Sequence, residues 1–456
     1  MLKSPMMKHT LLPLAEFQQR RQSFIEQMRD NSVAIFSANN EVTRSNDTEY
    51  LFCQDKTFYY LTGFNEPDAV LLLIKTADKS SSAQQVLFSL PKDPLTEIWQ
   101  GKRIGAQKAK EEYGFDECFT LDEIDSLLPD YFANTSALYF CRGHKKSFDQ
   151  KVLQWLEQVS AKSRQGIYAP SELIDCSNMV NELRLFKSPA ELDIMRKVNV
   201  ISGKAHQRAM EKTASGVFEY QIEAEILHEF ARHGARHAAY NSIVAGGDNA
   251  NILHYTANSE PLNDGDLLLI DAGGELAGYA ADITRTFPVN GKFSNEQRAL
   301  YQLVLDAQEQ CIAAIKPQQT LAGLNQLCCE IITKGLLELE ILSGDLNELI
   351  AEQACKKYFI HGLGHWLGLD VHDVGDYQVK DKKQYRLFEA GMVMTIEPGL
   401  YMPIDDDAID EKWRGIGIRI EDNVLVTEQG HENLTVNAPK SIDEIESVMK
   451  INKRLS

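Results

Sequence analysis

Residues 267–289, LLLIDAGGELAGYAADITRTFPV, decide the architecture of the second half of this chain. The apolar run LLLI predicts a buried strand, and it ends directly in Asp271. Gly273 and Gly274 then permit a turn, after which a second β-rich run begins at Asp282. This pattern predicts a hairpin with two carboxylates facing each other. Such a pair is costly to bury unless it protonates, meets cations or binds metal, so an ion pair and a metal site both remain open.

Two further strand-like runs in the same half also end in a carboxylate. Residues 392–396, MVMTI, are apolar and lead into Glu397. Residues 415–421, GIGIRIE, alternate with period two, so Arg419 and Glu421 share one face of the predicted strand. These two side chains could simply neutralise each other. Four carboxylates that follow one pattern nevertheless make a chance arrangement harder to accept.

The histidines favour a metal site over ion pairs. The segment HGLGHWLGLDVH holds His361, His365 and His372, and His254 lies upstream in ILHYT. The spacing of the first two resembles that of a zincin helix, but Gly362 occupies the position of the essential glutamate, so we reject that class. Two Asp, two Glu and at least one His make a ligand set rich in oxygen. Such a set fits a catalytic pair of divalent ions better than structural zinc.

Composition sets the remaining limits. A chain of 456 residues predicts two or three domains. The net charge of −19 argues against nucleic acid and anionic lipid as partners. The eight cysteines include no C-x-x-C pair, which favours reduced thiols and a cytoplasmic protein. Residues 1–21 contain no secretory apolar core, so we expect no signal peptide, and no apolar run approaches the length of a membrane span.

The first half of the chain has the pattern of a layered α/β domain. Short β-rich runs at 33–36, 69–74, 86–90 and 137–140 alternate with helical stretches. Ser188, Pro189 and Glu191 form a helix-start signal with a capping box. We therefore expect two domains, 1–178 and 179–456, although no linker composition marks the division.

These motifs in this order resemble those of a known family. The chain is similar to the bacterial Xaa-Pro aminopeptidases, or aminopeptidases P, among the pita-bread metallopeptidases. The likeness lies in NSIVAGGDNANILHYT, the 267–289 stretch, HGLGHWLGLDVHDVG, VMTIEPGLY and GIGIRIED, and extends to EVTRSNDTEY, YYLTGFNEPDAVLLLIK and EIWQGKR in the first half. It implies a creatinase-like N-terminal α/β domain, for oligomerisation and substrate access, and a C-terminal α+β pita-bread catalytic domain.

The resemblance also implies roles for individual residues. It implies that two divalent ions, most often Mn²⁺ with Co²⁺ or Zn²⁺ possible, are held by Asp271, Asp282, His365, Glu397 and Glu421, with Asp282 and Glu421 bridging. It implies that His254, His361 and His372 line the substrate pocket and take part in catalysis, that Arg419 organises the site, and that Trp99 and Asp47 reach toward a substrate in related oligomers. One departure is Gly364, where the family often has Ser.

The expected activity is hydrolysis of an N-terminal Xaa-Pro peptide bond by a metal-bridging hydroxide, with Glu397 transferring protons. Peptides with proline in second position are the expected partners, and a dimer or tetramer is the expected assembly. Two alternatives stay open. A prolidase would share the ligands but prefer dipeptides, and a metal-free pita-bread binding module would have lost its ions.

Overall fold

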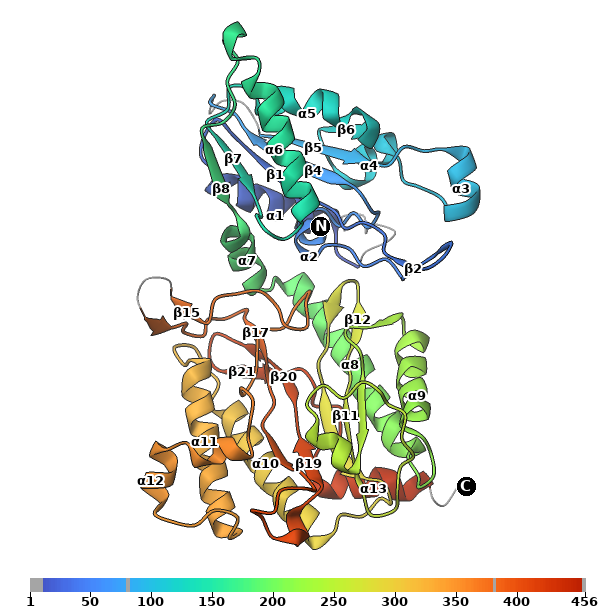
Figure 1. Cartoon of the computed structure of the whole chain (residues 1–456), viewed down its shortest axis with the longest axis vertical. Coiled ribbons are helices and arrows are strands. Elements are labelled where there is room, and N and C mark those ends of the chain that lie inside the picture. The colour runs from blue at the N-terminus through green and yellow to red at the C-terminus, as the bar shows by residue number, and fades with distance from the viewer. Residues whose placement is uncertain (1–10, 79–82, 380–382, 453–456) are drawn as a thin grey trace. The chain divides into compact units, whose positions relative to one another are not determined.

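The computed structural model describes residues 11–78, 83–379 and 383–452, and the chain divides into two compact units, 1–184 and 185–456 (Figure 1). This division and the predicted one after residue 178 both fall inside helix α7 (Ser177–Leu185). Residues 1–10, part of the stretch that predicts no signal peptide, lie outside the described residues. No helix in the described part of the chain is long and apolar enough to cross a membrane.

The N-terminal unit is an α/β sandwich built on one six-stranded sheet. Its elements are α1 (Leu14–Gln27), β1 (Ser32–Ser37), β2 (Thr43–Ser45), β3 (Thr48–Glu49), α2 (Lys56–Thr62), β4 (Val70–Lys75), β5 (Gln84–Ser89), α3 (Pro94–Gln100), α4 (Ala106–Tyr113), β6 (Glu117–Thr120), η1 (Leu121–Glu123), α5 (Ile124–Phe132), β7 (Ala137–Phe140), α6 (Lys146–Ser160), η2 (Ser163–Gln165), β8 (Glu172–Asp175) and α7. The four predicted β-rich runs correspond to β1, β4, β5 and β7.

The sheet order is β6-β5-β4-β1-β7-β8. β4 runs antiparallel to both neighbours, and the other pairings are parallel. Helices α5 and α6 pack Leu128 and Trp155 into the apolar core formed with β1, β4 and β5. Phe17 and Phe24 of α1 are fully buried, so one face of this helix packs into the unit. The unit is therefore the layered α/β domain that the pattern predicts.

The C-terminal unit is α+β. Its elements are α8 (Pro189–Lys212), α9 (Glu219–Arg232), β9 (His237–Ala238), β10 (Ile243–Gly246), η3 (Gly247–Asn251), β11 (Leu267–Asp271), β12 (Gly274–Leu276), β13 (Tyr279–Ala280), β14 (Thr284–Pro288), α10 (Asn295–Ala313), α11 (Leu321–Glu338), α12 (Leu346–Ala351), η4 (Ala354–Lys357), β15 (Gln378–Val379), β16 (Gln384–Tyr385), β17 (Val393–Ile396), β18 (Gly399–Met402), η5 (Glu411–Trp413), β19 (Ile416–Arg419), β20 (Asp422–Val426), β21 (His431–Asn433) and α13 (Ile442–Asn452).

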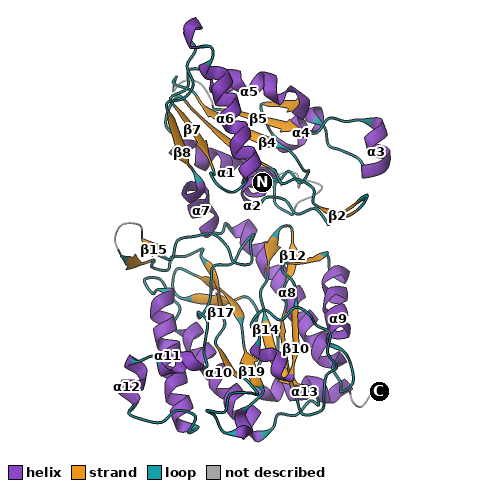
Figure 2. Cartoon of the chain, in the orientation of Figure 1, coloured by secondary structure: helices purple, strands orange, loops and turns teal. Residues whose placement is uncertain are grey.

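Antiparallel strands occupy the middle of this unit, and helices flank them on both sides (Figure 2). The main groups of strands are β10-β11-β14, β17-β20-β21 and β18-β19, which share one apolar core with α8 to α11. The predicted start of α8 is confirmed, because Ser188 accepts from the Glu191 backbone N–H while the Glu191 side chain accepts from that of Ser188. The core thus holds the strand ends that carry the predicted ligands.

The structure corrects the predicted turn in the 267–289 stretch. The chain does not turn at Gly273 and Gly274 but at Ala277 and Gly278, where β12 and β13 form a tight hairpin and both residues have positive φ. Gly273 instead serves a close approach, since a Cβ there would lie 1.7 Å from the Ala281 carbonyl oxygen. In the ladder between β11 and β14, Asp271 pairs with Thr284.

Candidate metal centre

One cavity of about 240 Å³ gathers most of the predicted site residues. Its walls come from strand ends and loops of the C-terminal unit. Asp271 ends β11, Glu397 follows β17, Arg419 ends β19, and Glu421 lies two residues later, just before β20. The residues that line it are Leu253, His254, Asp271, Asp282, His361, Gly362, Gly364, His365, His372, Glu397, Arg419 and Glu421. The five proposed ligands, the three pocket histidines and Arg419 therefore share one cavity.

The tightest group in the cavity is Asp282, His365 and Glu421. Each offers a ligand atom, and these atoms lie within 4.8 Å of one another. The His365 Nε2 atom is 3.3 Å from Asp282 Oδ2 and 3.5 Å from Glu397 Oε1, while its Nδ1 faces the Trp366 carbonyl at 3.0 Å. A histidine held at Nδ1 by a carbonyl presents its Nε2 lone pair to a metal. The three side chains thus have the orientation of ligands.

The carboxylates of this group carry more negative charge than their surroundings neutralise. Burial, and then the charges of neighbouring carboxylates, raise the pKa values of Asp282 and Glu421 well above their ordinary range. Burial also raises the pKa of Glu397. A divalent cation would remove this mutual repulsion, since it favours the ionised form of every carboxylate that it contacts. The chemistry of these donors therefore fits metal ions.

Asp271 differs from the other carboxylates of the cavity, because the guanidinium of Arg419 contacts it. The Arg419 Nη2 atom lies 2.6 Å from Asp271 Oδ2, and this guanidinium holds the pKa of Asp271 below its usual range against the effect of burial. Arg419 also donates to Thr284 Oγ1 at 3.2 Å and to the Tyr401 hydroxyl at 3.0 Å. Arg419 thus fixes Asp271 at the edge of the cavity.

Tyr240 also lies at the site, although no sequence motif indicates it. Its hydroxyl oxygen lies 2.5 Å from Oδ1 of Asp271 and 2.5 Å from Oδ1 of Asp282. A phenol has one hydrogen to donate, so the hydroxyl bonds one of the two aspartates and lies against the other. Tyr240 lies just before β10 in an ordinary β-rich context, and only the tertiary structure brings it between the two ligands.

The pocket histidines have different surroundings. The His361 Nε2 atom lies 2.7 Å from the Tyr401 hydroxyl, and its Nδ1 is 3.9 Å from Glu397 Oε2. Burial lowers the pKa of His361 to about 4, so it is neutral at physiological pH. The ring of His372 packs against that of His365 with centroids 4.1 Å apart, and burial lowers the pKa of His372. Neutral imidazoles suit hydrogen bonding to a substrate.

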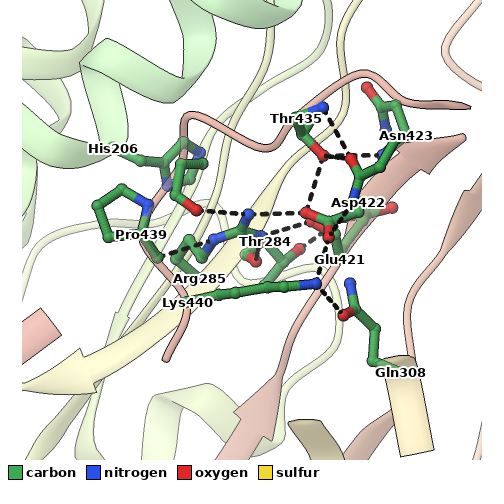
Figure 3. Close-up of polar contacts among 12 residues, drawn as sticks. His206, Thr284, Arg285, Gln308, Glu421, Asp422, Asn423, Thr435, Pro439 and Lys440 are labelled. Atoms are coloured by element: carbon green, nitrogen blue, oxygen red, sulfur yellow. Dashed lines mark hydrogen bonds and ion pairs between the residues drawn. The ribbon is translucent and has the colours of Figure 1, made fainter. Parts of the chain in front are cut away.

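A buried network of polar side chains positions Glu421 through its backbone carbonyl and its carboxylate (Figure 3). The guanidinium of Arg285, on β14, donates to the Glu421 carbonyl at 2.6 Å and to Asp422 Oδ1 at 2.7 Å. Lys440 Nζ lies 2.8 Å from Asp422 Oδ2, and Thr284 Oγ1 donates to Glu421 Oε2 at 2.7 Å. Arg285 was not among the residues predicted from the sequence, although a charge inside an apolar strand is the signal that indicated the candidate ligands.

The structure also explains the departure at Gly364. A Cβ at this position would lie 2.0 Å from the Thr395 carbonyl oxygen, so the backbone of β17 leaves no room for a side chain. The same strand binds the segment that carries His365, because the Thr395 N–H donates to the His365 carbonyl at 2.9 Å. Glycine here lets this segment lie against β17 and sets the position of His365.

The two predicted site residues of the first half lie in the other unit. Trp99 is on the short helix α3 with 88% of its surface exposed, and Asp47 lies in the turn between β2 and β3 with φ of 59°. The proposed part of these two residues in the substrate site stays a prediction.

Comparisons with known proteins match both units. A family model described as metallopeptidase family M24 matches residues 193–428, and a model of the aminopeptidase P N-terminal domain matches residues 17–139. The chain is 48% identical to an Xaa-Pro aminopeptidase of Escherichia coli, covering 95% of this chain and 97% of that one. It is 47% identical to an Xaa-Pro aminopeptidase of Haemophilus influenzae, covering 96% and 98%.

A solved structure is similar over nearly the whole chain. Zinc-substituted Escherichia coli aminopeptidase P in complex with product superimposes with a TM-score of 0.94 at 47% identity, covering 97% of this chain and 99% of that one. The expected α/β unit followed by a pita-bread unit is therefore confirmed.

Proposed function

Since the chain belongs to metallopeptidase family M24 and has the N-terminal domain of aminopeptidase P, we propose that it is a metal-dependent Xaa-Pro aminopeptidase that removes the first residue of peptides with proline in second position. The observation that carries this proposal is the group of buried carboxylates around His365, which lacks enough positive charge of its own. A fold without a metal would gain nothing from such a group.

Two divalent ions would be held by Asp271, Asp282, His365, Glu397 and Glu421, with Asp282 and Glu421 between them. Mn²⁺ is the expected metal, with Co²⁺ or Zn²⁺ as alternatives, because the donors are mainly carboxylate oxygens with one imidazole. Such ions, when bound, supply a nucleophilic water near neutral pH and polarise the scissile carbonyl. In support, the relative with the TM-score of 0.94 was solved with zinc substituted.

The protein's own groups would manage the proton and the substrate. Glu397 would accept the proton of the attacking water and return it to the proline nitrogen, since Thr395 Oγ1 holds its Oε1 at 3.2 Å and leaves Oε2 toward His361. His372 would bind the scissile carbonyl oxygen, and His254 and His361 would hold the rest of the peptide. Tyr401 fixes the His361 ring through the 2.7 Å contact at Nε2.

Proline explains why such a site is specialised. The nitrogen of an Xaa-Pro bond carries no hydrogen, so a peptidase that needs an N–H donor there cannot bind it. A site that binds the carbonyl and the free amine instead accepts this bond.

Trp99 and Asp47 would contact the peptide in an oligomer of two or four chains in the cytoplasm. The N-terminal unit would form the contacts between the chains of that oligomer.

A peptide series tests the activity. We expect cleavage of an Xaa-Pro-Xaa tripeptide after its first residue and at least 100-fold slower cleavage of the matched Xaa-Ala-Xaa peptide, by mass spectrometry of the products. Turnover restricted to Xaa-Pro dipeptides would instead indicate a prolidase. If the purified protein holds no divalent ion and chelator leaves its activity intact, the metallopeptidase proposal fails. No divalent ion together with no peptide cleavage would instead favour a metal-free binding module.

A further inference from the structure

Two thiols of the N-terminal unit lie together. Cys141 directly follows β7, and Cys176 directly follows β8. These strands are parallel, with Phe140 opposite Asp175, so the two cysteines are the next pair in register. The Cys176 N–H donates to the Phe140 carbonyl at 3.4 Å, which continues the ladder to this pair. Their Sγ atoms are 3.7 Å apart.

This arrangement permits a disulfide without movement of the backbone. Neighbouring strands lie roughly 4.8 Å apart, and disulfides span Cα separations of about 4.4 to 6.8 Å. Closing the Sγ separation to a bond of about 2.05 Å then needs only rotation of the two side chains.

The two thiols differ in access and in acidity. Cys141 is half-buried, whereas Cys176 has 0% of its surface exposed. The contact with the Cys176 thiol lowers the pKa of Cys141. The same contact and burial raise the pKa of Cys176. By contrast, burial raises the pKa of the half-buried Cys118 to about 12. An accessible, acidified thiol beside a buried one is the arrangement of an attacking and a resolving cysteine.

We propose that Cys141 and Cys176 form a thiol–disulfide exchange site that reacts with low-molecular-weight disulfides. The Cys141 thiolate attacks one sulfur of the disulfide, whose S–S bond breaks, and the first small thiol leaves and takes up a proton. Cys176 then loses its proton and attacks the Cys141 sulfur, which releases the second small thiol. The protein pair is oxidised by two electrons, and the small disulfide is reduced to two thiols.

The product would fasten an edge strand. β8 is the last strand of the six-stranded sheet, and its residues are mostly exposed. The new bond would tie the end of β8 to β7 and close a loop that contains α6. Since neither cysteine lines the catalytic cavity, oxidation should stabilise the N-terminal unit and leave peptide hydrolysis unchanged.

Peptide mapping tests the site directly. The full-length protein is equilibrated with glutathione disulfide, quenched in acid, alkylated and digested. We expect a disulfide-linked peptide that joins Cys141 and Cys176 in the wild type. In Cys176→Ser, we expect at least tenfold more mixed disulfide with glutathione on Cys141 than in the wild type, because the resolving thiol is absent. A mixed disulfide on other cysteines alone, with both of these thiols still alkylated, would overturn the proposal.

Cys118→Ser is the matched control, because Cys118 is half-buried at β6 of the same sheet. This variant should form the Cys141–Cys176 bond at the wild-type rate. Oxidation should also raise the thermal midpoint of the N-terminal unit by roughly 5 °C in the wild type and leave that of Cys141→Ser unchanged. An equal upward shift in Cys141→Ser would contradict the assignment.

Discussion

Glu421 and Asp422 are adjacent and equally buried, yet their surroundings act on negative charge in opposite ways. Asp422 lies between Arg285 and Lys440, which hold its pKa far below the usual range although burial acts in the other direction. Glu421 faces Asp282 and Glu397, and burial together with these charges raises its pKa. Two consecutive residues thus belong to different surroundings: Asp422 to a network with its charge neutralised, and Glu421 to a cavity with excess negative charge.

The comparison separates structural from functional charge. The Asp422 network satisfies its own charges and connects β14, β20 and the segment around Lys440. The Glu421 cavity contributes nothing comparable to folding, since its carboxylates repel one another. We infer that the first network stabilises the fold and positions the second, which is reserved for cations.

Asp282→Asn should produce the largest effect on function. Loss of a proposed metal ligand should lower kcat/KM for an Xaa-Pro-Xaa peptide by about 1000-fold or more. The metal-free variant should lose less than about 1 kcal/mol of unfolding free energy, because the repulsion among carboxylates falls. Activity and urea denaturation measure both quantities.

Asp306→Asn serves as the control, since Asp306 is exposed on α10 and its carboxylate accepts a hydrogen bond from Gln302. Both quantities should stay at the wild-type value there. An Asp282→Asn protein with wild-type activity would remove Asp282 from the metal centre.

Arg285→Met should have its main effect on stability and not on activity. It leaves Asp422 buried with a partner lost, so the unfolding free energy should fall by roughly 3–5 kcal/mol. The double variant Arg285→Met with Asp422→Asn should recover part of that loss, because the unpaired charge is then absent. Equal losses in the single and double variants, measured by urea denaturation, would show that Arg285 acts through packing alone.

Added metal should stabilise the wild type by a smaller amount. At a free ion concentration of 100 times Kd, linkage predicts about 2.7 kcal/mol for one site. The unfolding free energy of Asp282→Asn should rise much less on addition of the same ion. That of Arg285→Met should rise by nearly as much as in the wild type, because its metal ligands are unchanged. Thermal denaturation with and without Mn²⁺ measures this difference. The same gain in Asp282→Asn would place the ion elsewhere.

Tyr240→Phe should give the smallest effect. It removes one hydrogen bond to the ligands and keeps the ring, so metal affinity should weaken by about tenfold, or roughly 1.4 kcal/mol. Competition with a fluorescent chelator measures the Kd. Tyr385→Phe, at an exposed tyrosine of β16, is the control and should leave the Kd unchanged. An unchanged Kd in Tyr240→Phe would mean that the hydroxyl does not position the ligands.

The four carboxylates of the cavity could be predicted from the sequence for one physical reason, whereas the choice of His365 and the pita-bread fold came from the family resemblance. A charge at the end of an apolar strand is costly, so Asp271, Asp282, Glu397 and Glu421 stood out without structural information. The capping signal at Ser188 was equally local, and the structure confirms it.

What the sequence could not provide depends on tertiary contacts. Nothing local in the chain indicates that Tyr240 meets two aspartates or that a Cβ at Gly364 would clash with β17. The turn was misplaced because adjacent glycines suggest a turn, whereas Gly273 is needed for a close backbone approach and the true hairpin uses Ala277.

The number of bound metal ions tests whether the carboxylates around Glu421 bind cations. The metal-free protein is titrated with Mn²⁺ by calorimetry, and the bound ion is counted by mass spectrometry. We expect two ions per chain in the wild type, fewer in Asp282→Asn, and two in Asp306→Asn. If the wild type binds no ion, or if Asp282→Asn binds as many as the wild type with the same affinity, the excess negative charge around Glu421 has another purpose.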